Sequence, residues 1–283
     1  MMILEAFLLQ LEIMIGLILF AMIIIGIIIR SRKAELKKRE LKLKLQENFP
    51  EAWKEILRKK VIFYKELDDE DKSLFEKRIQ LFISSKNIDG VGTEIDDSIK
   101  LMVASSAVIP SFAFPGYNYP SVSTILLYPN SFDEEFKTER YKGHKEFITG
   151  MVGDGAMNGT VILSKPELEK AFDGIPHKTN VGIHEFVHLL DKEDGAIDGI
   201  PKLLIEDTHI DPWLFEIKKE MRKMEKGNSD INPYGITNNA EFLAVVSEYF
   251  FDNPDKFKRR HPELYSFLST FFYPDFNELE ERT

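Results

Sequence analysis

The stretch Asn180-Val-Gly-Ile-His184-Glu185-Phe-Val-His188-Leu-Leu-Asp191 holds the residues around which we expect the chain to fold. Residues four apart on an α-helix lie one above the other, so the imidazoles of His184 and His188 point at a common spot. Together they supply half of a tetrahedral zinc site. Glu185 projects beside them, where the glutamate of a His-Glu-x-x-His helix takes a proton from a zinc-activated water as general base.

The rest of this stretch favours a helix that is buried on one side. Its apolar side chains would enter a core and confine the polar groups to one strip. They are Val181, Ile183, Phe186, Val187, Leu189 and Leu190. The alternative is an amphipathic helix that carries two histidines by chance. We prefer the metal site, because two buried histidines without partners cost free energy that a zinc ion removes.

A third protein ligand must come from elsewhere, because a catalytic zinc has three protein ligands and one open position. Residues 238–251 predict a helix with Asn238 or Asn239 as its N-cap. Glu241 lies in the first turn of this helix, and Glu248 lies on nearly the same face. Either carboxylate could bind the metal, and Glu248 could instead form a salt bridge or orient a histidine. The spacing leaves both open.

Three segments resemble the Mlc titration factor A family of bacterial zinc peptidases. They are residues 184–191 (HEFVHLLD), 194–201 (DGAIDGIP) and 234–251 (YGITNNAEFLAVVSEYFF). The likeness extends over residues 49–272 and is strongest over residues 180–257. It implies a zincin-like domain, similar to the catalytic domain of lethal-factor-type toxins, with a small sheet beside the active-site helix.

The resemblance also implies roles for single residues. Glu241 would be the third ligand of one catalytic zinc ion. Independently of the resemblance, the positions of Glu248 and Asp191 make each of them a candidate to hydrogen-bond a ligand imidazole. Tyr234 is implied to take part in catalysis, where its hydroxyl would donate to the oxyanion. The function predicted is therefore a zinc metallopeptidase that hydrolyses a peptide or protein substrate, with Glu185 as base.

A regulatory protein is the alternative to an enzyme. The family takes its name from a member that binds and sequesters a sugar-responsive transcriptional repressor, so the resemblance also implies a protein partner of this kind. In that case the zinc site would be structural or vestigial. The intact Glu185 favours the enzyme, because a purely structural zinc has no use for a base at that position.

An apolar run opens the chain. Residues 13–29 are seventeen consecutive apolar or glycine residues. At ~1.5 Å per residue, this run nearly spans a bilayer core of ~30 Å. A cleaved signal peptide is the alternative, but it would begin with a basic region, and residues 1–20 contain no Lys or Arg. We therefore predict a retained transmembrane anchor over residues 1–30.

The basic residues that follow this anchor predict its orientation in the membrane. Residues 30–45 carry eight basic residues against two glutamates and fall largely in a predicted basic helical stalk over residues 31–48. Basic residues stay on the cytoplasmic side of a membrane and are attracted to anionic lipid. We therefore predict a single-pass membrane protein with its catalytic domain in the cytoplasm.

The domain that follows is acidic. The chain carries a net charge of −10, of which residues 1–29 contribute −2 and residues 30–45 contribute +6, so residues 46–283 carry −14. A domain with this charge does not bind nucleic acid through its bulk field. Because the chain contains no cysteine, any metal must be held by histidine and carboxylate.

The remaining patterns predict a helix-dominated α+β domain over residues 49–283. Residues 121–128 and 159–163 are typical of strands, and one of these would pair with extended substrate beside the metal. The glycine-rich segment 150–159 is interpreted as turns between strands. Helices are expected over residues 50–57, 68–86, 96–109 (from the resemblance), 166–172, 211–226, 254–260 and 262–272.

Two further patterns have structural interpretations. Asp191, Asp194 and Asp198 cluster with two glycines. A calcium loop is conceivable there, but the EF-hand pattern and its closing glutamate are missing, so we predict a structured turn. The other four histidines have no partner at ligand spacing and are expected to be surface residues. They are His144, His177, His209 and His261.

Overall fold

The computed structural model describes residues 24, 32, 47–114, 116–133, 148–153 and 155–273. The chain divides into two compact units, Met1–Asn48 and Phe49–Thr283. The predicted anchor and stalk lie outside the described residues, except at positions 24, 32, 47 and 48. Within the described ranges we find no helix that combines the length and the apolar character needed to cross a bilayer.

A four-stranded sheet forms one side of the larger unit. Its order is β1 (Asn87–Gly90), β2 (Thr124–Tyr128), β4 (Thr160–Ser164) and β3 (Gly150–Val152). The first three strands run parallel, and β3 pairs antiparallel with β4 at the edge. The two predicted strands correspond to β2 and β4. In β2, buried residues alternate with partly exposed ones, as in a half-buried strand, whereas β4 buries four consecutive residues, as a central strand does.

The other two strands were not predicted. The glycine-rich pattern over residues 150–159 predicts turns where β3 forms, and the expected strands do not include β1. Both are short, and β1 buries only Ile88. Each of them becomes a strand by pairing with a longer neighbour, β1 with β2 far along the chain and β3 with β4 across a short connection. That pairing is a tertiary contact, so local apolar periodicity does not indicate it.

Helices make up most of the described residues, which confirms the helix-dominated α+β class. They are α2 (Glu51–Lys60), α3 (Ile62–Glu66), α4 (Asp69–Ser85), α5 (Asp97–Val108), α6 (Lys165–Ala171), α7 (Val181–Asp191), α8 (Asp207–Glu225), α9 (Asn239–Asp252), α10 (Pro254–Arg260) and α11 (Pro262–Phe272), with 3-10 turns η1 (Gly155–Met157), η2 (Lys192–Asp194) and η3 (Pro233–Ile236). Helix α8 begins before the predicted residue 211, with Pro212 inside the helix rather than at its start.

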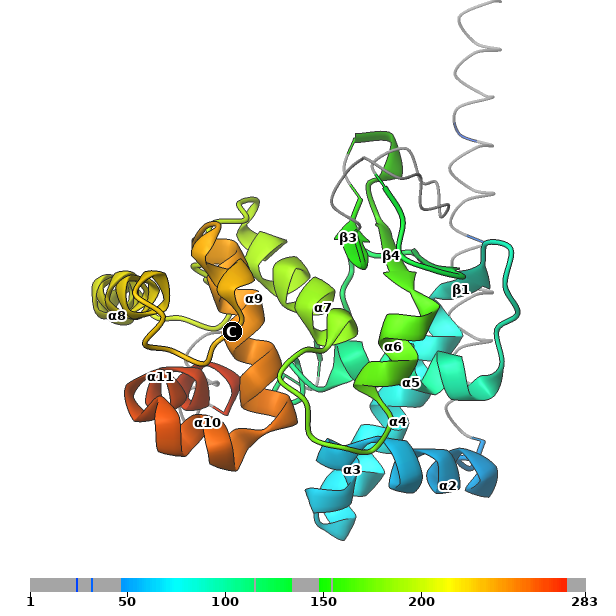
Figure 1. The fold of residues 1–283 in the computed structure, drawn as a ribbon. Coiled ribbons are helices and arrows are strands. Elements are labelled where there is room, and N and C mark those ends of the chain that lie inside the picture. The colour runs from blue at the N-terminus through cyan, green and yellow to red at the C-terminus, as the bar shows by residue number, and fades with distance from the viewer. Residues whose placement is uncertain are drawn as a thin grey trace, which may run out of the picture. The chain divides into compact units, whose positions relative to one another are not determined.

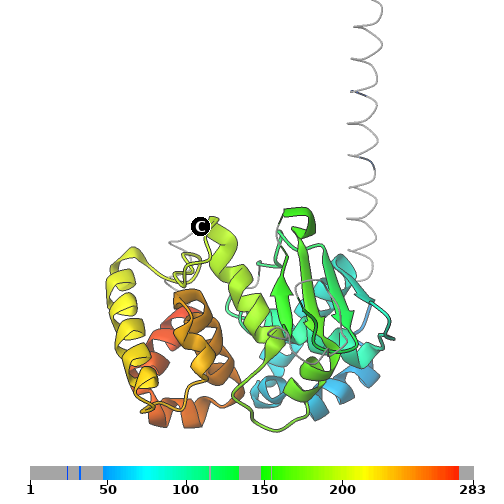
Figure 2. The same cartoon turned by 45° about the horizontal axis from the view of Figure 1, so that its top comes forward.

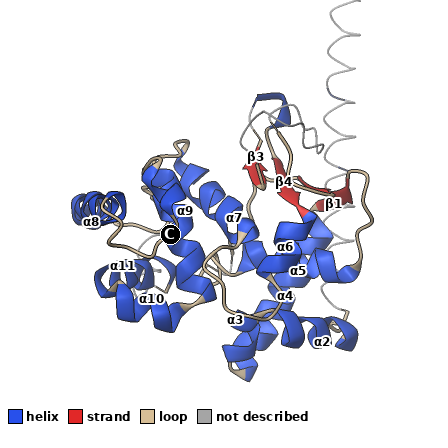
Figure 3. Ribbon diagram, viewed as in Figure 1, coloured by secondary structure: helices blue, strands red, loops and turns tan. Residues whose placement is uncertain are grey.

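Helix α7 lies at the centre of the unit. It packs against α9 on one side and against β3, α5 and α6 on the other. Figures 1 and 2 show it between the sheet and the group formed by α8, α9, α10 and α11. In Figure 3 all the strands lie on one side of α7, so the helix stands at the border between the sheet and the helical half.

Close packing fixes α7 in this position. Phe186 is fully buried, and its ring centroid lies 4.9 Å from that of Tyr119 and 5.6 Å from that of Phe82. Burying such a side chain contributes roughly 1.5–3 kcal/mol. On another face of α7, a Cβ on Gly182 would collide with Ser106 of α5. The helix is therefore packed through its apolar faces, and its two histidines line a cleft.

Candidate metal centre

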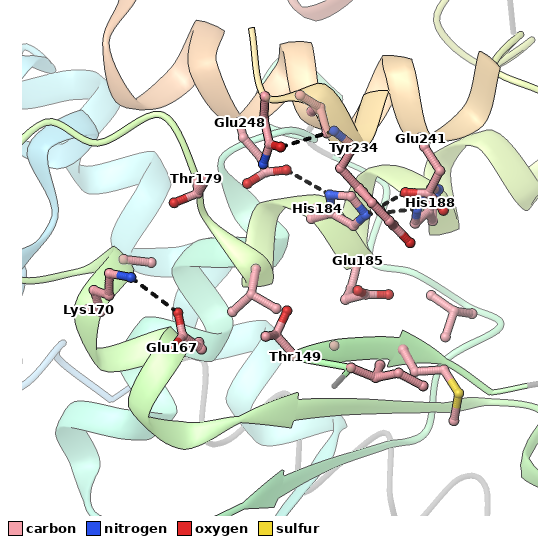
Figure 4. Close-up of a pocket in the computed structure, with 18 of the residues that line it drawn as sticks. Thr149, Glu167, Lys170, Thr179, His184, Glu185, His188, Tyr234, Glu241 and Glu248 are labelled. Atoms are coloured by element: carbon pink, nitrogen blue, oxygen red, sulfur yellow. Dashed lines mark hydrogen bonds and ion pairs between the residues drawn. The ribbon is translucent and has the colours of Figure 1, made fainter. Parts of the chain in front are cut away.

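Three predicted residues meet at one point. His184 and His188 project from successive turns of α7, and their Nε2 atoms lie 3.1 Å apart. Glu241 comes from the first turn of α9, and its Oε2 lies 3.0 Å from His184 Nε2 and 3.4 Å from His188 Nε2. Figure 4 shows the three side chains converging from the two helices. Each can offer a ligand atom to a common metal ion.

The spacing and the chemistry of these atoms fit a divalent cation. Ligand atoms ~2.0–2.1 Å from a tetrahedral ion lie ~3.3 Å from one another, which is close to the separations in this cluster. Glu248 Oε1 lies 2.7 Å from His184 Nδ1. Because a carboxylate only accepts, Nδ1 donates to Glu248, and with a metal bound Nε2 would offer its lone pair to the ion. A cation here would take the place of the protons that otherwise join the imidazoles to the Glu241 carboxylate.

Glu248 holds the first histidine in place from behind. Its second carboxylate oxygen accepts the backbone N–H of Asn180, which precedes α7. The side chain of Asn180 in turn caps α7 by accepting the N–H of Ile183 at 3.1 Å. Glu248 therefore ties the start of α7 to α9 and sets the orientation of the His184 ring. Asn180 had no assigned role in the sequence, although Asn before a helix is a recognised N-cap signal.

Burial and neighbouring charges shift the pKa values of His184 and Glu241 in opposite directions. Burial lowers the pKa of His184, but the carboxylates of Glu248 and Glu241 outweigh this effect and raise it well above the ordinary value. Burial raises the pKa of Glu241, whereas hydrogen bonds from the two imidazoles lower it to about 2. Glu241 therefore stays anionic at neutral pH, as a metal ligand must.

Glu185 lies on the same helix but in different surroundings. Its side chain is 5% exposed, and in Figure 4 its carboxylate lies between the ligands and the strand that follows Thr149. Burial raises the pKa of Glu185, and the neighbouring His184 and His188 offset part of that rise. The carboxylate thus has a higher proton affinity than an exposed glutamate, which suits a group that accepts and releases a proton.

Tyr234 stands at the mouth of the site. It belongs to η3, where its backbone N–H is held by Asn232 Oδ1 at 3.1 Å. The residue is 53% exposed, and its ring centroid lies 6.2 Å from that of His184. A tyrosine in this position can reach a molecule bound in the cleft while its ring shields one side of the histidine.

A cleft of about 870 Å³ surrounds the cluster. Edge strand β3 forms one wall and α6 contributes Glu167 and Lys170 farther along. The prediction that β2 or β4 would lie beside the metal was wrong. Both edges of β4 are paired and β2 lies between β1 and β4, so β3 is the strand that borders the cleft with a free edge among the described strands.

The aspartate cluster forms a structured turn, as predicted. Asp194 Oδ1 accepts the N–H of Ala196 at 3.0 Å, and Asp198 Oδ1 accepts that of Ile200 at 3.0 Å. Asp191 Oδ2 accepts the N–H of Gly199 at 2.8 Å. The hydrogen bond to a ligand imidazole comes from Glu248, so of the two alternatives the structure places Glu248, and not Asp191, behind a histidine.

One of the other histidines contradicts the prediction of a surface position. His261 is buried, with its Nε2 2.8 Å from Asp230 Oδ1 and its Nδ1 3.2 Å from Glu220 Oε1. Its carboxylate partners lie 31 and 41 positions earlier in the chain, so no local pattern indicates the pair. His177 and His209 are partly exposed, and His144 lies outside the described residues.

Two histidines one turn apart, a glutamate between them and a carboxylate from a later helix define the class of His-Glu-x-x-His metallopeptidases. A family model described as glucose-regulated metallo-peptidase M90 matches residues 33–273, and the chain belongs to this family. The resemblance stated from the sequence is thereby confirmed.

Several relatives support this assignment. An uncharacterized protein of Synechocystis sp. is 31% identical over 239 residues, which cover 80% of this chain and 85% of that protein. Mlc titration factor A of Pectobacterium atrosepticum is 30% identical over 161 residues, covering 53% of this chain and 59% of that protein. Mlc titration factor A of Cronobacter sakazakii is 25% identical over 218 residues, which cover 74% of this chain and 81% of that protein.

Proposed function

We propose that the chain is a zinc-dependent peptidase that hydrolyses peptide bonds in the cleft between α7 and β3. The observation that carries the proposal is the convergence of His184, His188 and Glu241 beside a buried glutamate, Glu185. Membership of a metallopeptidase family supports the same reaction class. Zinc is the preferred metal because two imidazoles and one carboxylate are typical ligands of a catalytic zinc.

Glu185 and Tyr234 have different roles in the proposed reaction. When bound, zinc would lower the pKa of a water from ~16 toward ~7 and polarise the substrate carbonyl. The carboxylate of Glu185 takes the proton as the water oxygen attacks the carbonyl carbon. It then delivers this proton to the leaving amine as the C–N bond breaks. The hydroxyl of Tyr234 donates to the oxyanion, a contribution of about 3 kcal/mol to the transition state.

The substrate class follows from the wall of the cleft. The outer edge of β3 offers backbone groups to a chain that binds in extended conformation. Its three residues, Gly150, Met151 and Val152, all line the cleft. A peptide paired with this strand would run alongside the ligands, with its scissile carbonyl beside Glu185.

Metal removal and restoration test the proposal. The purified full-length chain is expected to contain one zinc ion and to cleave members of a mixed peptide library, detected by mass spectrometry. A chelator should abolish cleavage, and added zinc should restore it. A chain that binds no zinc, or that cleaves equally well after chelation, would contradict the proposed function.

We propose further that residues 1–30 anchor the protein in a membrane, with the peptidase domain in the cytoplasm. The apolar run 13–29 and the basic residues that follow it support this topology. Alkaline phosphatase fused after Thr283 is then expected to be inactive, and a fluorescent protein fused there to be bright in the membrane fraction. An active phosphatase fusion would place the domain on the other side of the membrane.

A regulatory function is a second candidate. The name Mlc titration factor A describes relatives that titrate Mlc, and by analogy this chain would bind a regulatory protein. The two candidates differ in their dependence on Glu185. A variant without this carboxylate should lose hydrolysis, whereas binding of a protein partner should be unaffected.

A further inference from the structure

A glycine occupies the point where the edge strand passes the metal helix. Gly150 is the first residue of β3 and pairs with Leu163 of β4. A Cβ added to it would lie 2.5 Å from Glu185 Oε1, 2.8 Å from Glu185 Cγ and 2.7 Å from Val181 Cγ2. Optimal carbon contacts are ~3.5–4.0 Å, so no larger residue fits unless a side chain of α7 moves.

Position 150 requires a glycine because a larger side chain would overlap α7, and not because of its backbone conformation. The glycines with positive φ are found elsewhere in the chain, and Gly150 has an extended conformation that any residue adopts. The strand cannot easily retreat from α7, because the N–H of Ser164 donates to the carbonyl of Thr149 at 2.7 Å and the β4 ladder holds the residues that follow. A glycine within a strand often marks a close approach of this kind.

The two neighbours of Gly150 differ in their freedom to move. Val181 is β-branched, and a helix allows such a side chain essentially one rotamer. Glu185 is unbranched, and its carboxylate is the far end of a flexible chain. A methyl group at position 150 would therefore displace Glu185 first, while α7 and the two histidines stay in place.

We propose that Gly150 is a positioning residue for the reaction, because its missing side chain makes the space in which the Glu185 carboxylate stands beside the ligands. This inference rests on the proposed role of Glu185 as the base. The edge strand then has two tasks, since its outer backbone edge faces the peptide and its first residue sets the place of the base.

Gly150→Ala in the full-length chain tests the proposal, with Gly116→Ala as the matched control, because a Cβ on Gly116 meets nothing within 4 Å. Zinc content and circular dichroism should be unchanged in both. For the peptide that the wild type cleaves best, Gly150→Ala should lower kcat on the order of 100-fold, as expected for a misplaced catalytic group, with KM nearly unchanged. A wild-type kcat overturns the proposal.

Thermal unfolding provides a readout that needs no peptidase activity. Gly150→Ala should lower the melting temperature less in a Glu185→Ala background than in the wild type, because the overlapping carboxylate is then absent. Equal shifts in the two backgrounds overturn the proposal. If the wild type cleaves no peptide, the proposed function fails, and the shifts alone decide whether Gly150 and Glu185 share this space.

A second variant covers the case in which Gly150→Ala does not fold. Adding Val181→Ala removes the Cγ2 contact and keeps the overlap with Glu185. The double variant should fold, bind zinc and show a kcat far below that of Val181→Ala alone. A double variant that remains unfolded overturns the proposal, because the space would then be required by the fold and not by Glu185.

Discussion

Glu185→Gln is expected to lower the rate of peptide hydrolysis by about 10²–10⁴-fold, the usual contribution of a positioned general base, and to leave the zinc content unchanged. Glutamine has nearly the same shape as glutamate but cannot take a proton from water. Glu185 is not among the three residues whose ligand atoms converge, so the metal should not respond to the change. Hydrolysis rates and metal content by mass spectrometry measure the two effects.

The control for this prediction is Glu169→Gln. Glu169 is exposed on α6 and is not among the residues that line the cleft. The control removes the same charge and should keep wild-type rates. Full activity in Glu185→Gln would refute the assignment of the base. Loss of zinc from that variant would show instead that Glu185 helps to hold the metal.

Glu241→Ala should have the largest effect on metal binding. It removes one of three ligand atoms and leaves the two imidazoles without the negative charge that faces them. Glu248→Ala should weaken zinc by only ~10- to 100-fold, the usual effect of losing the partner behind a ligand. Zinc affinity, measured by competition with a chelator, should therefore fall more in Glu241→Ala than in Glu248→Ala.

Glu169→Ala is the matched control here and should bind zinc like the wild type, since its carboxylate lies outside the cleft. Circular dichroism of each variant distinguishes loss of a ligand from loss of the fold. The reverse order, with zinc retained by Glu241→Ala and lost by Glu248→Ala, would show that the third ligand has been misassigned.

The helical part of the fold was largely predictable because its signals are local. Asn180 and Asn238 precede their helices and cap them through hydrogen bonds to the third residue that follows. The outer parts of the sheet were not predictable in this way. Gly150 looks like a turn residue in the sequence and becomes part of an edge strand only because Leu163 lies opposite it.

The sequence by itself determined that His184 and His188 share a helix face with Glu185 beside them, because helical spacing is a local property. For the third ligand, spacing left Glu241 and Glu248 open, the family resemblance favoured Glu241, and the packing of α7 on α9 brings that carboxylate to both Nε2 atoms. Only the tertiary structure decided the role of Glu248, the strand that borders the cleft and the space at Gly150. Each of these depends on contacts between segments that are far apart in the chain. The distance in space between such segments is set by how their side chains pack, and local sequence patterns do not determine it.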